Sequence, residues 1–480
     1  MIGTGTAKKI NLFVLLMAIA AVLILPLSKQ VWYDETVSIL CSKGINHDTH
    51  TLFANDTVVS SATVERLNNV SNVYKATIID NGNSFVYNVK LHYFTLLFGN
   101  SIGVYMLFSK LCAIVALLAF FWLCRLVFKD SIFTAVAIVL LATDLTFMGM
   151  SHEIRAYELG TCFVTLAAIF FYKFMYEEEK PFYLFLLGLF SVGAVLSHFL
   201  SVYIILVFLG YLVATKRAGL FKTRNLAAMA IPAALVAVYM WFAVAGLRQM
   251  SHQNEAIHEK VAVLPFSALH VLYRSMAMVS VDFDIVLQAF SNKKAVVLLS
   301  FILMLGLYIM AWVWAKQKEE KKKLNLLFLL GISGSLFLAL LCFKSQHYTA
   351  MYNRYHSFCV PFASLATAYA LYLIARASGV STLIKAGLIS VVMLPAVALF
   401  FIAARKTTTT ASEYPHIAVA EEIVHNNVSK VEIPEWDDAL LIQAVLPRGY
   451  KIDYVLRPAS PYFALYKNGA VVKVPLEHKK

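Results

Sequence analysis

Charged residues are scarce in this chain of 480 residues: they make up 14% of it, while hydrophobic residues make up 60%. A soluble protein of this length needs more charge to cover its surface, so the composition indicates a membrane protein. Acidic residues are the scarcer kind, 28 against 41 basic ones, which gives a formal net charge of +13. This excess does not indicate nucleic-acid binding, because the basic residues lie mostly in short loops between apolar runs.

The sequence also lacks the patterns of several common sites. Its six cysteines show no Cys-x-x-Cys spacing and most lie in apolar segments, which favours buried free thiols over disulfides or a metal site. No Walker loop or GxGxxG motif is present, so ATP-driven work has no support. The segment Asn46-His47-Asp48-Thr49-His50 is interpreted as an exposed loop rather than a metal site.

Long apolar runs dominate the chain instead. A helix needs about 20 apolar residues to cross a bilayer. Lys8 and Lys9 precede the first run, and no small-residue cleavage site follows it, so we expect a retained first helix. The fold class predicted is an all-α polytopic membrane protein with about eleven transmembrane helices. The candidate spans are residues 10–28, 104–124, 132–150, 156–174, 182–197, 199–215, 225–246, 295–315, 324–343, 356–375 and 383–403.

The positions of the basic residues predict how the chain is oriented. With the N-terminus inside, the basic loops all fall on the cytoplasmic side, as the positive-inside rule requires. The short outward turns contain only three cations: Arg155, Lys344 and Arg354. We therefore expect a multi-pass protein of the cytoplasmic (inner) membrane, with a site that faces the periplasm or exterior.

Two domains are expected. Residues 1–403 would form the transmembrane domain, with long outer loops at 29–103 and 247–294 that carry interfacial helices. In the first loop, one amphipathic helix is predicted between Val59 and Thr77; in the second, one or two helices between Pro265 and Phe290. Residues 404–480 would form a small extracytoplasmic α/β tail. Its predicted elements are a helix at 413–426 and strands at 439–445, 452–456, 462–466 and 470–474, the last two flanking the hairpin turn Asn468-Gly469.

Asp34 and Glu35 are the first candidate site residues. They follow the first span, and Trp32 and Tyr33 would anchor them at the depth of the lipid headgroups. A carboxylate held at the membrane face could accept a proton from an incoming hydroxyl or amine, as a general base does. The structural alternative is a pair of solvated carboxylates at a helix end.

Three later outward turns supply candidate partners. An arginine can bind phosphate oxygens bidentately, and the histidines and tyrosines could contact a donor or acceptor. The structural alternatives are a polar turn with an internal Glu–Arg pair, a satisfied histidine and an interfacial belt of Tyr and Lys. Asp144, inside a span, could be explained by pairing with Lys110. The candidates are His152, Glu153, Arg155 and Tyr157 in the first turn, His198 in the second, and Lys344, His347, Arg354 and Tyr355 in the third.

The order of these motifs resembles a known family. Asp34-Glu35 after the first span, Ser-x-Glu-x-Arg-x-Tyr at 151–157 and the late Arg354-Tyr355 followed by Pro361 are similar to the GT-C membrane glycosyltransferases. The branch it resembles contains protein O-mannosyltransferases and the lipid A aminoarabinose transferase. The resemblance extends through most of residues 10–403.

The resemblance implies a hexosyl- or pentosyltransferase that uses a polyprenyl-phosphate sugar as the donor. Asp34 would be the base, with Glu35 beside it. The donor phosphate would be held by Arg155, Lys344 and Arg354. The sugar would be transferred by direct displacement with inversion. The acceptor could be a protein, lipid or glycan, and the use of a divalent metal stays open because no convincing ligand set is visible. Two other hypotheses remain: a flippase or transporter of a lipid-linked glycan, and a non-catalytic membrane scaffold.

Overall fold

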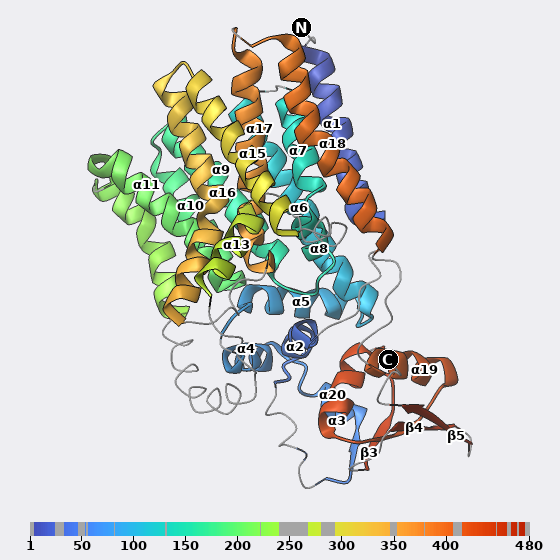
Figure 1. The fold of residues 1–480 in the computed structure, drawn as a ribbon. Coiled ribbons are helices and arrows are strands. Elements are labelled where there is room, and N and C mark those ends of the chain that lie inside the picture. The colour runs from blue at the N-terminus through green and yellow to red at the C-terminus, as the bar shows by residue number, and fades with distance from the viewer. Residues whose placement is uncertain are drawn as a thin grey trace.

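The computed structural model describes residues 4–24, 33–46, 53, 56–80, 82–129, 132–220, 222–239, 267–279, 293–345, 353–378, 380–406, 415–447, 449–457, 462–467 and 470–475. Long helices form a bundle, and short helices and a small sheet lie at one end of it (Figure 1). The N-terminus lies at the opposite end of the bundle.

The bundle helices agree with the predicted spans. Among the described residues, seven helical segments are long and apolar enough to cross a membrane and four further apolar helices are shorter. Each of the eleven predicted spans overlaps one of them. The chain is therefore a helical multi-pass membrane protein. The bundle comprises α1 (Thr4–Ile24), α6 (Ile102–Phe128), α7 (Phe133–Ala142), α9 (Tyr157–Tyr176), α10 (Pro181–Ser197), α11 (Val202–Leu220), the helix Thr223–Tyr239, α15 (Lys293–Trp314), α16 (Lys318–Ser345), α17 (Val360–Arg376) and α18 (Thr382–Lys406).

Burial differs sharply between these helices. In the most apolar window of the segment Arg354–Arg376, which contains α17, 83% of the residues are buried, against 17% in that of α15. α17 is thus central, while α15 turns leucines such as Leu298 and Leu299 outward. A helix satisfies its own backbone hydrogen bonds, so such an apolar outer surface is stable in lipid.

The predicted span at 132–150 is two helices rather than one. α7 ends at Ala142, and α8 (Leu145–Met150) begins after Asp144. The Asp144 carboxylate caps α8 by accepting a hydrogen bond from the Phe147 N–H at 3.0 Å. Lys110, the partner expected for Asp144, instead donates to the Leu23 carbonyl oxygen at 3.1 Å.

The first outer loop contains several short elements instead of one amphipathic helix. They are α2 (Tyr33–Ser42), β1 (Val58–Ser60), α3 (Ser61–Glu65), α4 (Val70–Ile79) and α5 (Phe85–Phe98). The predicted helix between Val59 and Thr77 was wrong, since β1, α3 and α4 share that stretch. In the second outer loop, α13 (Ala268–Val279) confirms a helix; Pro265 and Phe290 lie outside the described residues.

The tail contains α19 (Pro415–Asn426), β2 (Lys430–Ile433), α20 (Trp436–Val445), β3 (Asp453–Leu456), β4 (Tyr462–Lys467) and β5 (Ala470–Pro475). The predicted helix and the β4–β5 hairpin are confirmed, whereas the predicted strand at 439–445 belongs to α20. At the start of α20 the Glu435 N–H donates to the Asp438 carboxylate at 3.0 Å, a cap that favours the helix.

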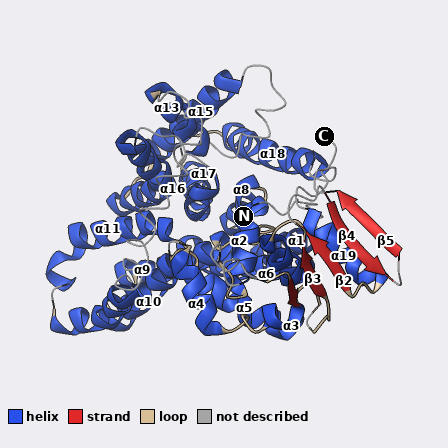
Figure 2. Cartoon of the chain, turned by 90° about the horizontal axis from the view of Figure 1, so that it is seen from below, coloured by secondary structure: helices blue, strands red, loops and turns tan. Residues whose placement is uncertain are grey.

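The tail sheet includes a strand from the first outer loop. Its order is β1-β3-β2-β4-β5, with β2 and β3 parallel and the other pairs antiparallel. Figure 2 shows β2, β3, β4 and β5 together at one side of the molecule. Val58 of β1 pairs with Val455 of β3, and Phe53 and Val59 are buried in the core of the tail. The tail is thus joined through β1 to the loop that carries α2.

Candidate active site

α2 lies at the end of the bundle where the tail docks, which we call the site end (Figure 1). It begins at Tyr33, so Asp34 and Glu35 occupy its first turn, where the helix dipole favours negative charge. Trp32, the expected membrane anchor before them, lies outside the described residues. Because successive helix positions point about 100° apart, the two carboxylates face different surroundings.

Glu35 points into the protein. Its side chain is completely buried, and Oε1 accepts a hydrogen bond from the Ile154 backbone N–H at 2.8 Å. A buried N–H group needs such an acceptor, because an unsatisfied one costs about 1–3 kcal/mol. Glu35 therefore attaches α2 to the turn between α8 and α9, and it is closed off from an incoming substrate.

Asp34 faces outward and meets a cation from the far end of the sequence. Its Oδ2 lies 3.3 Å from Nη2 of Arg354, in the 3₁₀ helix η3 (Asn353–Cys359). The Asp34 side chain is 27% exposed and that of Arg354 is 19% exposed. Both groups are thus accessible enough to meet a ligand, and they are close enough for their opposite charges to attract.

Arg155 holds α2 from the other side. Its Nη1 donates to the Asp34 carbonyl oxygen at 2.8 Å and to Ser38 Oγ at 3.0 Å. Its Nε is buried and has no hydrogen-bond partner among the described residues. Nη1 therefore fixes the position of the Asp34 backbone, whereas the Nε–H group is a donor that no described residue uses.

Three candidate rings pack behind the two arginines. The rings of Tyr157 and His198 have centroids 5.0 Å apart, and Tyr355 lies 6.4 Å from Tyr157 and 6.2 Å from His198. Gly160, one turn into α9, makes this packing feasible: a Cβ there would lie 2.6 Å from the Phe358 ring. The close approach of α9 to η3 brings Tyr157 beside Arg354.

His152, His198 and Glu153 are more deeply buried than the Asp34–Arg354 pair. Burial, and then the charges of Arg155 and Arg354, lower the pKa of His198 to about 3, so this ring is neutral at physiological pH. His198 Nδ1 accepts from the Leu200 N–H at 3.3 Å. His152 Nδ1 lies 2.9 Å from the Met148 carbonyl oxygen, and His152 and Glu153 are both buried. These contacts indicate supporting roles rather than direct contact with a ligand.

Lys344 is a candidate that the described part of the structure does not bring into the cluster. Lys344 is exposed in the last turn of α16, and no contact joins it to the candidate residues within the described part of the chain. His347 lies outside the described residues. Over the same described ranges, no group of three or more His, Cys, Asp or Glu side chains is placed to hold a metal ion. The sequence left the use of a divalent metal open, and the described residues offer no ligand set for one.

Sequence reasoning missed the residues that position α2. Ser38 is one helical turn after Asp34 and faces Arg155, a spacing that could have suggested it. At the other end of α2, the Ser42 carbonyl oxygen lies 3.0 Å from His92 Nδ1, and Lys43 donates to Thr95 Oγ1 at 3.0 Å. No local signal predicts these contacts, because α5 provides them from about 50 residues away.

Part of the chain is similar to a known protein family. Residues 83–243 match the family model described as dolichyl-phosphate-mannose-protein mannosyltransferase. The chain resembles a GT-C glycosyltransferase of the protein O-mannosyltransferase branch. The matched region contains Arg155, Tyr157 and His198, whereas Asp34 and Arg354 lie outside it. A search of curated protein sequences finds no match.

Two solved structures are similar to this chain at low sequence identity. ArnT from Cupriavidus metallidurans bound to undecaprenyl phosphate has a TM-score of 0.48 and 13% identity, over 91% of this chain and 74% of that one. The oligosaccharyltransferase AglB from Archaeoglobus fulgidus, in complex with an inhibitory peptide and a dolichol-phosphate, has a TM-score of 0.45 and 14% identity. That comparison covers 94% of this chain and 65% of the oligosaccharyltransferase, so this chain spans just under two thirds of it.

Proposed function

We propose that the chain is an integral membrane glycosyltransferase that moves a sugar from a polyprenyl-phosphate donor to an acceptor at the outer face of the cytoplasmic membrane. The observation that carries the proposal is the partly exposed contact between Asp34 and Arg354, with Arg155 bonded to the Asp34 backbone beside it. The family-model match over residues 83–243 supports the same class of reaction.

In the proposed reaction Asp34 is the general base. The acceptor oxygen or nitrogen forms a bond to the anomeric carbon of the sugar while Asp34 takes its proton. The bond from that carbon to the phosphate oxygen breaks on the opposite face, so the configuration inverts. The electron pair leaves with the polyprenyl phosphate. The partly exposed Arg354 would contact this charge, and Arg155, whose Nε is buried, would stabilise it electrostatically from a longer distance.

The resting contact has a role in this scheme. In the structure the Asp34 carboxylate is occupied by its contact with the Arg354 guanidinium group. A donor phosphate would compete for the same guanidinium group and withdraw Arg354 from Asp34. Binding of the donor would thereby release the Asp34 carboxylate for contact with the acceptor.

The first test is transfer from radiolabelled polyprenyl-phosphate sugars to a membrane extract, catalysed by the purified full-length protein. Asp34→Asn should reduce transfer by about 10²–10⁴-fold while leaving expression and membrane insertion intact. Asp453→Asn is the matched control, because Asp453 is an exposed carboxylate in the tail sheet, outside the site. It should transfer as the wild type does.

Two outcomes would count against the proposal. Transfer by Asp34→Asn at the wild-type rate would remove Asp34 as the base. No transfer by the wild type from any donor, despite specific binding of the lipid, would favour a transporter of lipid-linked glycans. Label that moves only with the wild type and the Asp453→Asn control would establish the class and identify the sugar.

A further inference from the structure

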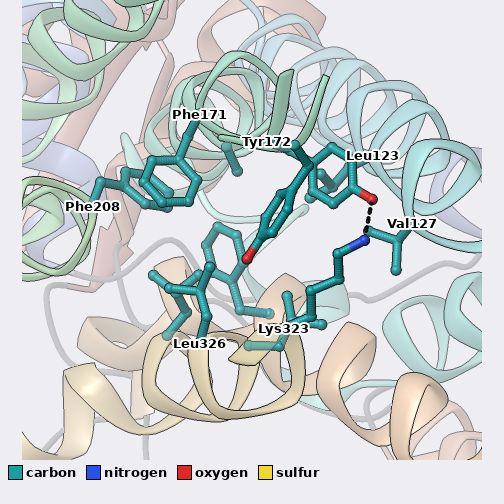
Figure 3. Close-up of a pocket in the computed structure, with 12 residues that line it drawn as sticks. Leu123, Val127, Phe171, Tyr172, Phe208, Lys323 and Leu326 are labelled. Carbon is teal, nitrogen blue, oxygen red and sulfur yellow. Dashed lines mark hydrogen bonds between the residues drawn. The ribbon is translucent and has the colours of Figure 1, made fainter. Parts of the chain in front are cut away.

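A crevice opens at the end of the bundle opposite the candidate site. It comprises about 400 Å³ of space free of protein atoms, including the part open to the surroundings. Its walls come from α6, α9, α11, α16 and α17. Except for Lys323, Tyr172 and Tyr176, the side chains that line it are apolar, among them Leu123, Phe171 and Phe208 (Figure 3). Nothing in the proposed transfer reaction uses this crevice.

Lys323 is held at the crevice by aromatic side chains. Its ammonium group donates to the Tyr172 hydroxyl at 3.1 Å and lies 5.2 Å and 4.6 Å from the ring centroids of Tyr172 and Tyr176 (Figure 3). Within the described ranges, no carboxylate lies at ion-pair distance from it; the nearby Glu319 instead pairs with Lys322 at 2.7 Å. Cation–π contacts orient a cation but leave its charge uncompensated.

The height of Lys323 in the bundle matches a lipid headgroup region. Arg376, at the end of α17, lies beside Glu320, so this end is opposite Arg354. We call it the basic end. Lys323 and Lys344 are separated along α16 by 21 residues, about 32 Å at 1.5 Å per residue. The hydrocarbon core of a bilayer is about 30 Å thick, so the two lysines reach opposite headgroup layers.

We propose that the crevice binds one glycerophospholipid with an anionic headgroup, taken from the leaflet at the basic end. Its phosphate would contact the Lys323 ammonium group, and one acyl chain would enter the apolar crevice between α9, α11 and α16. Charge complementarity favours an anionic over a zwitterionic headgroup, since basic pockets between transmembrane helices on the cytoplasmic side suit anionic lipids. Lys173 and Arg376 add positive charge at the same end, although each also contacts a glutamate.

Native mass spectrometry of the detergent-solubilised full chain tests this proposal. The probes are phosphatidylglycerol and phosphatidylcholine with identical acyl chains, each titrated to give an affinity for the first bound lipid. The wild type should prefer phosphatidylglycerol, and Lys323→Met should weaken its binding about fivefold or more. Lys323→Arg, which keeps the charge, should retain the preference. Lys321→Met is the matched control, because Lys321 lies over the Trp312 ring at 4.1 Å, outside the crevice.

Three results would overturn the proposal. The first is equal binding of both phospholipids by the wild type. The second is an equal loss of affinity for phosphatidylglycerol in Lys321→Met and Lys323→Met, which would show that general surface charge, and not the crevice, attracts the lipid. The third is displacement of phosphatidylglycerol by glycerol phosphate or polyprenyl phosphate at equal concentration. Displacement by glycerol phosphate would show a site for a free phosphate, and displacement by polyprenyl phosphate would show a second site for a prenyl lipid.

Discussion

The same types of charged residue have different roles at the two ends of the bundle. At the site end, Glu35, Asp34 and Arg155 make contacts between elements far apart in the sequence, and Glu35 is fully buried. At the basic end, some pairs such as Lys173–Glu177 join neighbouring turns and others such as Arg376–Glu320 join two helices, but both of these pairs are partly exposed. Buried polar contacts carry a large penalty when one partner is removed, whereas exposed ion pairs contribute little. Charge at the site end therefore fixes geometry, and charge at the basic end mainly meets the surrounding lipid and water.

The strongest test of this contrast is Arg155→Met. The substitution removes two charge-assisted hydrogen bonds to α2 and should lower the free energy of unfolding by roughly 3 kcal/mol or more. Transfer should fall as well, because the Asp34 backbone loses its support. Thermal unfolding in detergent and the rate of transfer measure the two effects. An unfolding temperature equal to that of the wild type would contradict the positioning role.

The second test separates the two adjacent carboxylates. Glu35→Ala leaves the buried Ile154 N–H without its acceptor and should cost about 1–3 kcal/mol of stability. Glu35→Gln keeps an oxygen for this bond and should retain most of the stability and transfer. Differential scanning fluorimetry and the transfer assay give both readouts. If Glu35→Gln lost transfer as completely as Asp34→Asn, both carboxylates would belong to the chemistry.

The third test uses pH at the site end. The folded pKa of His198, about 3, lies below the value near 6.5 of an unfolded histidine, so between these values the unfolded chain binds one more proton. Stability from this group is complete above about pH 6.5 and falls as the pH drops, by about 2 kcal/mol at pH 5. His198→Gln should therefore flatten the dependence of the unfolding temperature on pH between 7 and 5. An unchanged slope would refute this assignment.

The smallest effect is expected at the basic end. Glu177→Gln breaks the exposed i,i+4 pair with Lys173 at 3.3 Å, which should change the free energy of unfolding by about 0.3–0.5 kcal/mol. The same fluorimetric assay measures it, in low and in high salt, because screening should remove the difference. A loss of 2 kcal/mol or more would mean that the two ends do not differ in the way described.

Some features of this fold could be predicted from the sequence because they depend on local composition. The apolar runs predict the helices of the bundle, and the turn Asn468-Gly469 predicts the β4–β5 hairpin. The break before α8 was missed, since hydropathy does not register a cap such as Asp144. Residues 439–445, most of α20, were predicted as a strand, although Glu435 and Asp438, three positions apart, already indicated a helix start.

The candidate site was predictable as a set of residues but not as a geometry. The sequence placed Asp34, Glu35, Arg155 and Arg354 on one side of the membrane, and the structure brings them into one cluster. It could not distinguish an exposed base from a buried acceptor, because Asp34 and Glu35 are adjacent and chemically alike. Only the surrounding helices, some more than 100 residues away, determine which of the two faces outward.

The pairing of β1 with β3 also sets an order in time. Ser60 is paired with Asp453, so β1 leaves the ribosome nearly 400 residues before its partner. At about 5–20 residues per second, the loop that carries α2 remains without this strand contact for roughly 20–80 s. The surface around Asp34 is therefore among the last parts of the protein to be completed. A chain that stops before β3 retains all of its bundle helices and still lacks this closure.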